Sequence, residues 1–154
     1  MEFFPIPLKK VHQGIIFMQE TRSTESDLIS WKSEWQGALI LNHGTRNSQG
    51  TLIAFTTNLN CKIINKYFDS EGRFQLVTIE YENQKILLVS IYNENVESKQ
   101  VILLKNLNEK LSNILDIWDY EILIGGDWNF ILNKKLDADG GSPSLKLSSI
   151  AELV

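Results

Sequence analysis

The sequence predicts an α/β fold in which a strand-rich first half is followed by one long helix and one more strand. Short apolar runs bounded by turn residues indicate strands near 15–19, 37–42, 51–57, 61–68, 73–81 and 85–92. Turn sequences at 69–72 and 82–84 join the last three runs, so this part is expected to be an antiparallel meander. Residues 98–118 then carry apolar side chains at i, i+3 and i+4 spacing, which is typical of an amphipathic helix.

A shorter helix is expected to begin at Thr24. Asp27 follows three residues later, which is the spacing of a capping box, in which the two side chains satisfy free backbone N–H groups. Leu28, Trp31 and Trp35 come next at the spacing of one helix face. This helix is therefore expected to bury one apolar face.

The composition is that of an ordinary folded domain, since 43% of the 154 residues are hydrophobic and 22% are charged. Cys61 is the single cysteine, and no Cys/His cluster has zinc spacing, which fits a reducing compartment. No apolar run approaches the roughly 18 residues that span a bilayer, so we expect an intracellular protein, nuclear or cytoplasmic, without a membrane partner. The net charge of -4 argues against non-specific coating of nucleic acid.

Candidate catalytic side chains follow the apolar run 122–124. Two glycines lead into Asp127, Trp128 and Asn129. In an extended backbone residues i and i+2 share one side, so Asp127 and Asn129 are expected to face one pocket while Trp128 packs. A carboxylate can orient water and an amide can donate to a phosphoryl oxygen, which suits phosphodiester hydrolysis. The alternative is a surface turn after a buried strand, where Gly, Asp and Asn are common for backbone reasons.

Two other apolar runs end in a similar way. Glu20 follows the run 15–19, and Tyr92 with Asn93 ends the run 85–91. Sites in sheet proteins gather beyond the carboxyl ends of strands, so the three strand ends are predicted to meet at one site. Taken singly, a Glu after a strand is usually solvated and a Tyr is usually a core residue with a polar tip.

These motifs resemble the endonuclease/exonuclease/phosphatase superfamily and, within it, the endonuclease domain of LINE-type retrotransposons. IIFMQET is similar to the strand that carries the metal-binding Glu, here Glu20, and VSIYNEN is similar to the segment with the active-site Tyr, here Tyr92. GGDWN resembles the family's GDFN and places the catalytic residues on Asp127 and Asn129, with Trp128 where Phe is usual. The resemblance implies a sandwich of two β-sheets flanked by helices.

Further segments resemble LINE-type members in particular, namely Asn42 to Phe55, the DSEGR turn at 69–73, and Leu136 to Gly141. Two family features are missing: an opening strand with a metal-holding Asn, and a closing Ser-Asp-His segment. His12 and His43 are the only histidines, and neither lies in such a segment. We therefore expect residues 1–154 to be a single partial domain, the first portion of the fold, with an atypical segment at 1–10 and reduced activity.

The resemblance implies a DNA-nicking endonuclease that uses Mg²⁺, with Mn²⁺ as a substitute and no small-molecule cofactor. Glu20 would hold the metal and Asp127 would orient the attacking water. Tyr92 and Asn129 would donate to phosphoryl oxygens, with Asn93 a weaker candidate. Phosphate contacts would come from basic side chains, Arg22, Arg46, Lys134 and Lys135. DNA is the expected partner, and a reverse transcriptase the expected neighbour in a longer polyprotein.

Two other functions remain open. The chain is either an inactive remnant or binding module, or a phosphoinositide phosphatase or sphingomyelinase of the same superfamily. The missing opening strand would also leave the edge of the strand at 15–19 exposed. We therefore expect poor solubility or self-association unless residues 1–8 fill the gap, which Pro5 and Pro7 disfavour.

Overall fold

The computed structural model describes residues 13–117 and 119–129, which form two compact units. The first unit contains the chain up to Tyr92 together with Tyr120–Asp127, and the second contains Asn93–Asp119 and the residues from Trp128 onward. Several expectations lie outside the described residues: those for the segment 1–10, His12, Trp118, Lys134, Lys135 and Leu136 to Gly141.

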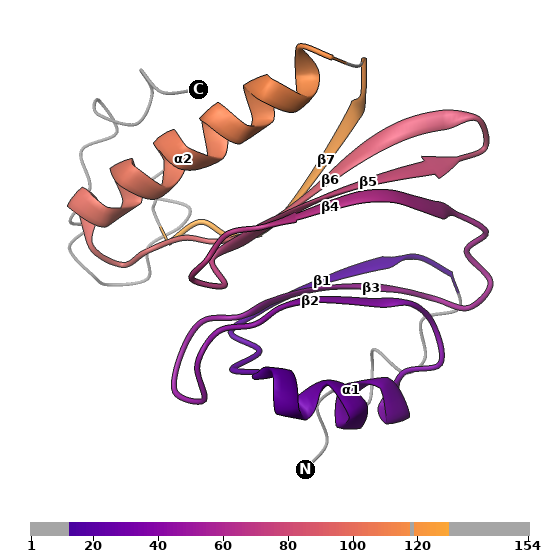
Figure 1. Cartoon of the computed structure of the whole chain (residues 1–154), viewed down its shortest axis with the longest axis horizontal. Helices are drawn as coiled ribbons and strands as arrows, with labels where there is room; N and C mark the ends of the chain where they lie inside the picture. The colour runs from indigo at the N-terminus through magenta and orange to yellow at the C-terminus, as the bar shows by residue number, and fades with distance from the viewer. Residues whose placement is uncertain (1–12, 118, 130–154) are drawn as a thin grey trace, which may run out of the picture. The chain divides into compact units, whose positions relative to one another are not determined.

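The first unit is a sandwich of two β-sheets with a helix on the outer face of one of them (Figure 1). The first sheet has the order β1-β3-β2 and is antiparallel, and its strands are β1 (Ile15–Gln19), β3 (Thr51–Phe55) and β2 (Leu39–Asn42). The second sheet has the order β4-β5-β6-β7, and its strands are β4 (Lys62–Phe68), β5 (Phe74–Tyr81), β6 (Gln84–Tyr92) and β7 (Glu121–Asp127). β4, β5 and β6 form the predicted antiparallel meander, and β7 adds parallel to β6. The predicted α/β sandwich is confirmed.

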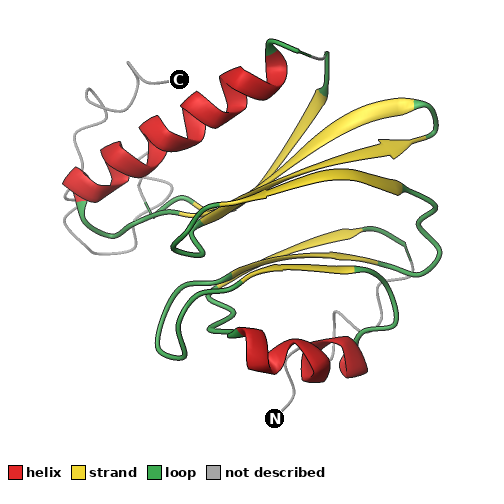
Figure 2. Ribbon diagram, viewed as in Figure 1, coloured by secondary structure: helices red, strands yellow, loops and turns green. Residues whose placement is uncertain are grey.

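Strand alternation sends the apolar residues of this unit to opposite faces of its sheets, and two of the resulting clusters involve the first sheet. One core lies between the sheets and contains six side chains that are at most 2% exposed, namely Ile40, Ile53, Phe55, Val77, Ile79 and Leu88. The other lies on the outer face of the first sheet, where Leu41, Leu52 and Ala54 pack under Trp31 and Trp35. Trp31 belongs to α1 (Leu28–Glu34), the helix that covers this face in Figure 2.

The predicted helix start is confirmed. A 3₁₀ turn, η2 (Glu25–Asp27), leads into α1, and Thr24 and Asp27 form the capping box. The carboxylate of Asp27 accepts from the backbone N–H of Thr24 at 2.8 Å and from its hydroxyl at 2.7 Å. These hydrogen bonds lower the pKa of Asp27, the one from the Thr24 side chain contributing most.

The apolar run of β7 is half exposed in the described structure. Ile122, Leu123 and Ile124 are 44%, 46% and 46% exposed. β7 pairs with β6 on one side, and no other described strand pairs with it. The run resembles a central strand because apolar residues occupy both of its faces, but in the described chain it is an edge strand.

The second unit contains α2 (Glu97–Leu115), which corresponds to the helix predicted at 98–118. Gln100, Leu103, Leu104 and Leu107 are buried, and their spacing marks one helix face. Neither α1 nor α2, the helices of the described residues, is long and apolar enough to span a membrane.

The Gly37→Ala substitution should destabilise the first unit. A Cβ atom at Gly37 would lie 1.7 Å from the carbonyl oxygen of Phe55, which accepts from the indole N–H of Trp35 at 2.8 Å. Since the obstructing atom is backbone, we expect a loss of about 1–3 kcal/mol in the free energy of unfolding, the usual cost of overpacking. Urea denaturation measures it, with the exposed neighbour Gln36→Ala as the control. Equal stability of the two variants would show that the Phe55 backbone shifts to make room for the added methyl group at little cost.

Candidate active site

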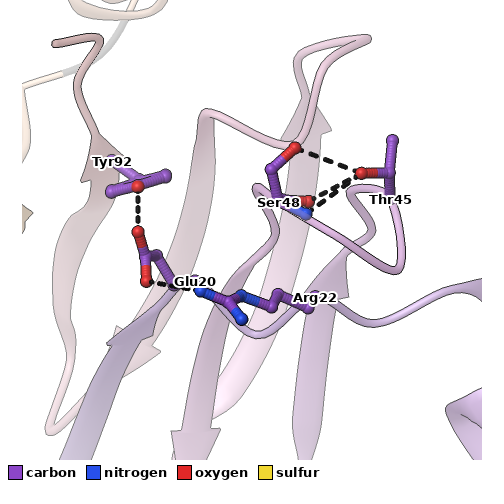
Figure 3. A network of polar contacts seen from close by, with 5 residues as sticks. All are labelled: Glu20, Arg22, Thr45, Ser48 and Tyr92. Atoms are coloured by element: carbon purple, nitrogen blue, oxygen red, sulfur yellow. Dashed lines mark hydrogen bonds and ion pairs between the residues drawn. The ribbon is translucent and has the colours of Figure 1, made fainter.

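Three strands of the first unit carry a polar residue at their carboxyl ends. Glu20 follows β1, Tyr92 ends β6 and Asp127 ends β7. Tyr92 and Asp127 are directly opposite in the parallel register of β6 and β7, and the hydroxyl of Tyr92 donates to Oε1 of Glu20 (Figure 3). The structure therefore brings Glu20, Tyr92 and Asp127 to one edge of the sandwich.

The backbone that carries Glu20 adopts an unusual conformation. Glu20 and Arg22 have φ angles of 53° and 49°, in the left-handed region that non-glycine residues rarely enter. Two hydrogen bonds to the loop between β2 and β3 hold this segment: Thr21 N–H to the Gly50 carbonyl at 3.1 Å, and Arg22 N–H to the Gln49 carbonyl at 2.9 Å. Strained backbone held by its surroundings is typical of functional sites.

Tyr92 is held in its protonated form. Its side chain is mostly buried, and burial raises the pKa of the phenol, with further contributions from the hydrogen bond to Glu20 and from the charges of Glu20 and Asp127. The positive charge of Arg73 opposes this shift without cancelling it. At neutral pH the phenol is therefore a hydrogen-bond donor.

Glu20 has the chemistry of a ligand for a hard cation. Its carboxylate is 49% exposed and forms an ion pair with Arg22 at 3.5 Å. An exposed pair of this kind contributes little stability, so a divalent cation can replace Arg22 as the partner of Glu20. Mg²⁺ is commonly held by one or two carboxylates, with water and substrate oxygens completing the shell. Glu20 fits this pattern, although the described residues contain no group of three His, Cys, Asp or Glu that could hold a metal together.

Arg73 positions Tyr92, a role that the sequence analysis missed. Its carbonyl oxygen accepts from the Tyr92 N–H at 2.7 Å, and its guanidinium lies 4.8 Å from the centroid of the Tyr92 ring. The stacked cation fixes the plane of the ring. In the sequence, Arg73 was noted only as the last residue of the DSEGR turn.

Asp69 fixes the turn that presents Arg73. Its Oδ1 accepts from the backbone N–H groups of Arg73 and Phe74 at 2.7 and 2.8 Å, and from the side-chain amide of Asn42 at 2.7 Å. Its Oδ2 accepts from Glu71 N–H at 3.0 Å. Asn42 ends β2, so this carboxylate connects the two sheets beside the site.

The loop between β2 and β3 borders the same edge. The Ser23 hydroxyl and Nδ1 of His43 are 3.1 Å apart, and Gly44 N–H donates to the Ser23 carbonyl at 3.1 Å. Thr45 and Ser48 bond to one another in the exposed part of the loop (Figure 3). His43 therefore has a structural partner, and Ser48 and Thr45 present hydroxyl groups near Arg22.

Asn129 and Asn93 belong to the second unit. The Asn129 amide donates to the Asn93 carbonyl at 2.7 Å, and the Asn93 amide donates to the Trp128 carbonyl at 2.9 Å. Gln100 donates to the Asn129 carbonyl at 2.9 Å. Gln100 was missed, although a polar residue among the apolar positions of a helix face is a usable signal.

The extended geometry expected for Asp127 and Asn129 is wrong. β7 ends at Asp127, and Asn129 has a φ of 50°, so strand alternation does not reach it. Its expected role as a hydrogen-bond donor to a phosphoryl oxygen therefore does not follow from strand alternation.

Comparison with known proteins gives a sequence relative and several structural ones. No protein-family model matches the chain. It is 23% identical over 128 residues to the transposon TX1 uncharacterized 149 kDa protein of Xenopus laevis, covering 83% of this chain and 10% of that protein. The chain thus spans a tenth of that relative.

Solved structures share its fold. TDP2 from Caenorhabditis elegans superposes with a TM-score of 0.58 at 17% identity, over 80% of this chain and 40% of that one. D. rerio TDP2 in complex with single-strand DNA product gives 0.54 at 16% identity, over 84% and 53% of the two chains. The chain has the endonuclease/exonuclease/phosphatase fold. Within this fold, the beta toxin of Staphylococcus aureus, as a β-hairpin deletion mutant, gives 0.50 at 12% identity, over 95% and 60%.

Asp69→Ala should destabilise the first unit more than Asp69→Asn. Alanine leaves the Arg73 and Phe74 N–H groups without their acceptor and removes one of the two acceptors of the Asn42 amide, which keeps the Phe74 carbonyl. A buried donor left unsatisfied costs about 1–3 kcal/mol. Asparagine keeps one oxygen that can accept these three bonds. We expect urea denaturation to show a loss of about 3 kcal/mol for alanine and less than half of it for asparagine. Equal losses would mean that the negative charge matters and the geometry of the acceptor does not.

Proposed function

We propose that this chain hydrolyses a phosphodiester bond of DNA with the help of Mg²⁺, as an endonuclease of LINE-type retrotransposon origin. The fold supports hydrolysis, since its superfamily contains phosphodiester hydrolases. The similarity to a transposon protein and the DNA product bound to D. rerio TDP2 support a DNA substrate. We further propose that the chain is part of a longer polyprotein that carries a reverse transcriptase.

One observation carries the proposal: the Tyr92 hydroxyl donates to the Glu20 carboxylate, and Asp127 is opposite Tyr92 at the same sheet edge. This combines a protonated donor with two exposed carboxylates in one place. A phosphodiester needs these components, since negative charge builds on its oxygens while water attacks.

The proposed roles follow from the state of each group. Asp127 is exposed, so it can accept a hydrogen bond from the attacking water and orient it. Tyr92 donates a hydrogen bond to a phosphoryl oxygen once Glu20 is engaged elsewhere. Glu20 would hold Mg²⁺, which when bound polarises the phosphate and stabilises the leaving 3′ oxygen. Asn129 remains a candidate second donor, and Arg22, released from Glu20, is a candidate phosphate contact.

The experiment is a nicking assay on supercoiled plasmid with Mg²⁺. We expect slow conversion to open circles, because the recognised family motifs lack the Ser-Asp-His segment, and removing one member of a catalytic set typically costs about 10⁴-fold. Asp127→Ala and Glu20→Ala should each abolish the remaining nicking. Glu71→Gln, which removes an exposed carboxylate outside the triad of Glu20, Tyr92 and Asp127, is the matched control.

Two results would count against the proposal. Nicking that survives in Asp127→Ala would come from another site or a contaminant. No nicking by the wild-type chain at high protein concentration, with Mg²⁺ or Mn²⁺, would favour the inactive binding module.

Cation binding can be tested separately from turnover. Free Mn²⁺ gives an electron paramagnetic resonance signal that is lost on binding, so a titration reports affinity without a substrate. Glu20→Gln keeps the size of the side chain and removes its charge, and we expect it to weaken binding by about tenfold or more. Glu82→Gln, in the β5–β6 turn, should bind as the wild type does. Unchanged affinity in Glu20→Gln would remove Glu20 as the ligand.

A further inference from the structure

Four uncharged polar residues lie at one level of the first unit, between its apolar core and the candidate site. We call them the polar layer, and they are Gln19 of β1, Thr51 of β3, Gln75 of β5 and Ser90 of β6. Two residues away on each strand, on the same face, an apolar side chain belongs to the core between the sheets or packs against it: Phe17, Ile53, Val77 and Leu88. In the other direction β1, β5 and β6 lead to Glu20, Arg73 and Tyr92. The polar layer therefore lies directly beneath the site.

The polar layer connects the two sheets. Gln19 is opposite Thr51 in the first sheet, and Gln75 is opposite Ser90 in the second. Between the sheets, the side-chain amide of Gln75 donates to the Thr51 hydroxyl at 3.3 Å and to the Ile40 carbonyl at 3.4 Å. The four side chains are thus consecutive neighbours, in the order Gln19, Thr51, Gln75 and Ser90.

Three buried atoms of the polar layer have no hydrogen-bond partner among the described residues. They are Nε2 of Gln19, Oε1 of Gln75 and Oγ of Ser90. Gln75 and Ser90 are 0% exposed, and buried polar groups are nearly always paired with protein or with ordered water. The first atom donates, the second accepts and the third can do either. A cation would suit the two oxygens but not the amide N–H groups, whereas a water molecule suits all three.

We propose that the polar layer binds one internal water molecule, through which Gln75 and Ser90 act as positioning residues for Glu20. This water accepts from Gln19, donates to Oε1 of Gln75 and has the Ser90 hydroxyl as its third partner. Internal waters typically make about three hydrogen bonds to groups of this kind. The relevance of the polar layer to hydrolysis rests on the proposed function, whereas its effect on the position of Glu20 does not.

The polar layer holds the chain on both sides of the strained segment. Gln19 and Thr51 are the last pair of the β1–β3 ladder, and Gln19 directly precedes Glu20, which has the left-handed φ of 53°. Beyond this pair, the N–H groups of Thr21 and Arg22 bond to the end of the β2–β3 loop, directly before Thr51. Fixing Gln19 against the second sheet therefore fixes the point at which the strained segment starts.

Nuclear magnetic resonance tests for the water in the wild-type chain. A long-lived internal water gives laboratory-frame and rotating-frame Overhauser cross-peaks of opposite sign with nearby amide protons, whereas surface water exchanges too fast to do so. We expect peaks of opposite sign between water and the side-chain amide of Gln19. The exposed amide of Gln84, in the β5–β6 turn, is the control and should not give them. Their absence at Gln19 would overturn the proposal.

Amide hydrogen exchange tests the positioning role with a matched pair of variants. Gln75→Met keeps a long side chain and removes both polar atoms, whereas Leu76→Met changes a side chain of the same strand that is 1% exposed and apolar. In Gln75→Met we expect the Thr21 and Arg22 N–H groups to exchange at least about tenfold faster than in the wild type, because local opening controls their exchange. The N–H of Thr56, which bonds to Gly14 at the opposite end of the β1–β3 pair, should keep its rate. Leu76→Met should leave all three rates unchanged.

Two results would contradict the positioning role. Unchanged exchange at Thr21 and Arg22 in Gln75→Met would show that the polar layer does not hold the strained segment. Equal acceleration at Thr56 would show a general loss of stability. Ser90→Ala, which removes a single hydroxyl, is measured in the same way and decides the matter if Gln75→Met does not fold. Both experiments are performed without metal or DNA, so failure of the proposed hydrolysis would not affect their outcome.

Discussion

The carboxylate of Asp69 is the contact on which the geometry of the site depends. Its Oδ1 accepts three hydrogen bonds at 2.7 to 2.8 Å, from Asn42 at the end of β2, from Arg73, and from Phe74, the first residue of β5. Hydrogen bonds to an ionised acceptor are shorter and stronger than neutral ones. They fix Arg73, whose carbonyl and guanidinium hold Tyr92, and Tyr92 in turn bonds to Glu20. One oxygen atom thus couples the packing of two sheets to the position of the candidate metal ligand.

The other half of the site depends on backbone strain. Glu20 and Arg22 adopt left-handed conformations that cost of order 1–3 kcal/mol each and persist only where the surroundings impose them. Gly50 makes this arrangement feasible: its φ is 96°, and a Cβ atom there would lie 2.2 Å from the Thr21 hydroxyl. The glycine lets the β2–β3 loop approach the Glu20 segment and bond to it. The LINE-like segment from Asn42 to Phe55 therefore has a structural role beside the site, whatever it contributes to substrate binding.

Local patterns predicted most of the fold, because each pattern reports contacts within a few residues. The meander, the capping box at Thr24 and the helix after residue 97 are all present, and Glu20, Tyr92 and Asp127 follow the strands that carried them in the sequence. Arg73 was missed because its role depends on stacking over a residue 19 positions away in the chain. Asn129 was misplaced because a left-handed φ interrupts the alternation that the prediction assumed.

The burial of β7 shows how a local pattern and a tertiary context can disagree. A run of apolar residues is typical of a strand with neighbours on both sides, because such a strand is covered on both faces. β7 has this sequence and yet only one described neighbour. Consistency between local sequence and environment is the rule in folded proteins, so a mismatch of this kind indicates a missing contact. The environment of β7 matters to the site as well, since Asp127 ends this strand and lies opposite Tyr92 of β6. The position of Asp127 relative to Tyr92 therefore depends on the parallel pairing of β7 with β6.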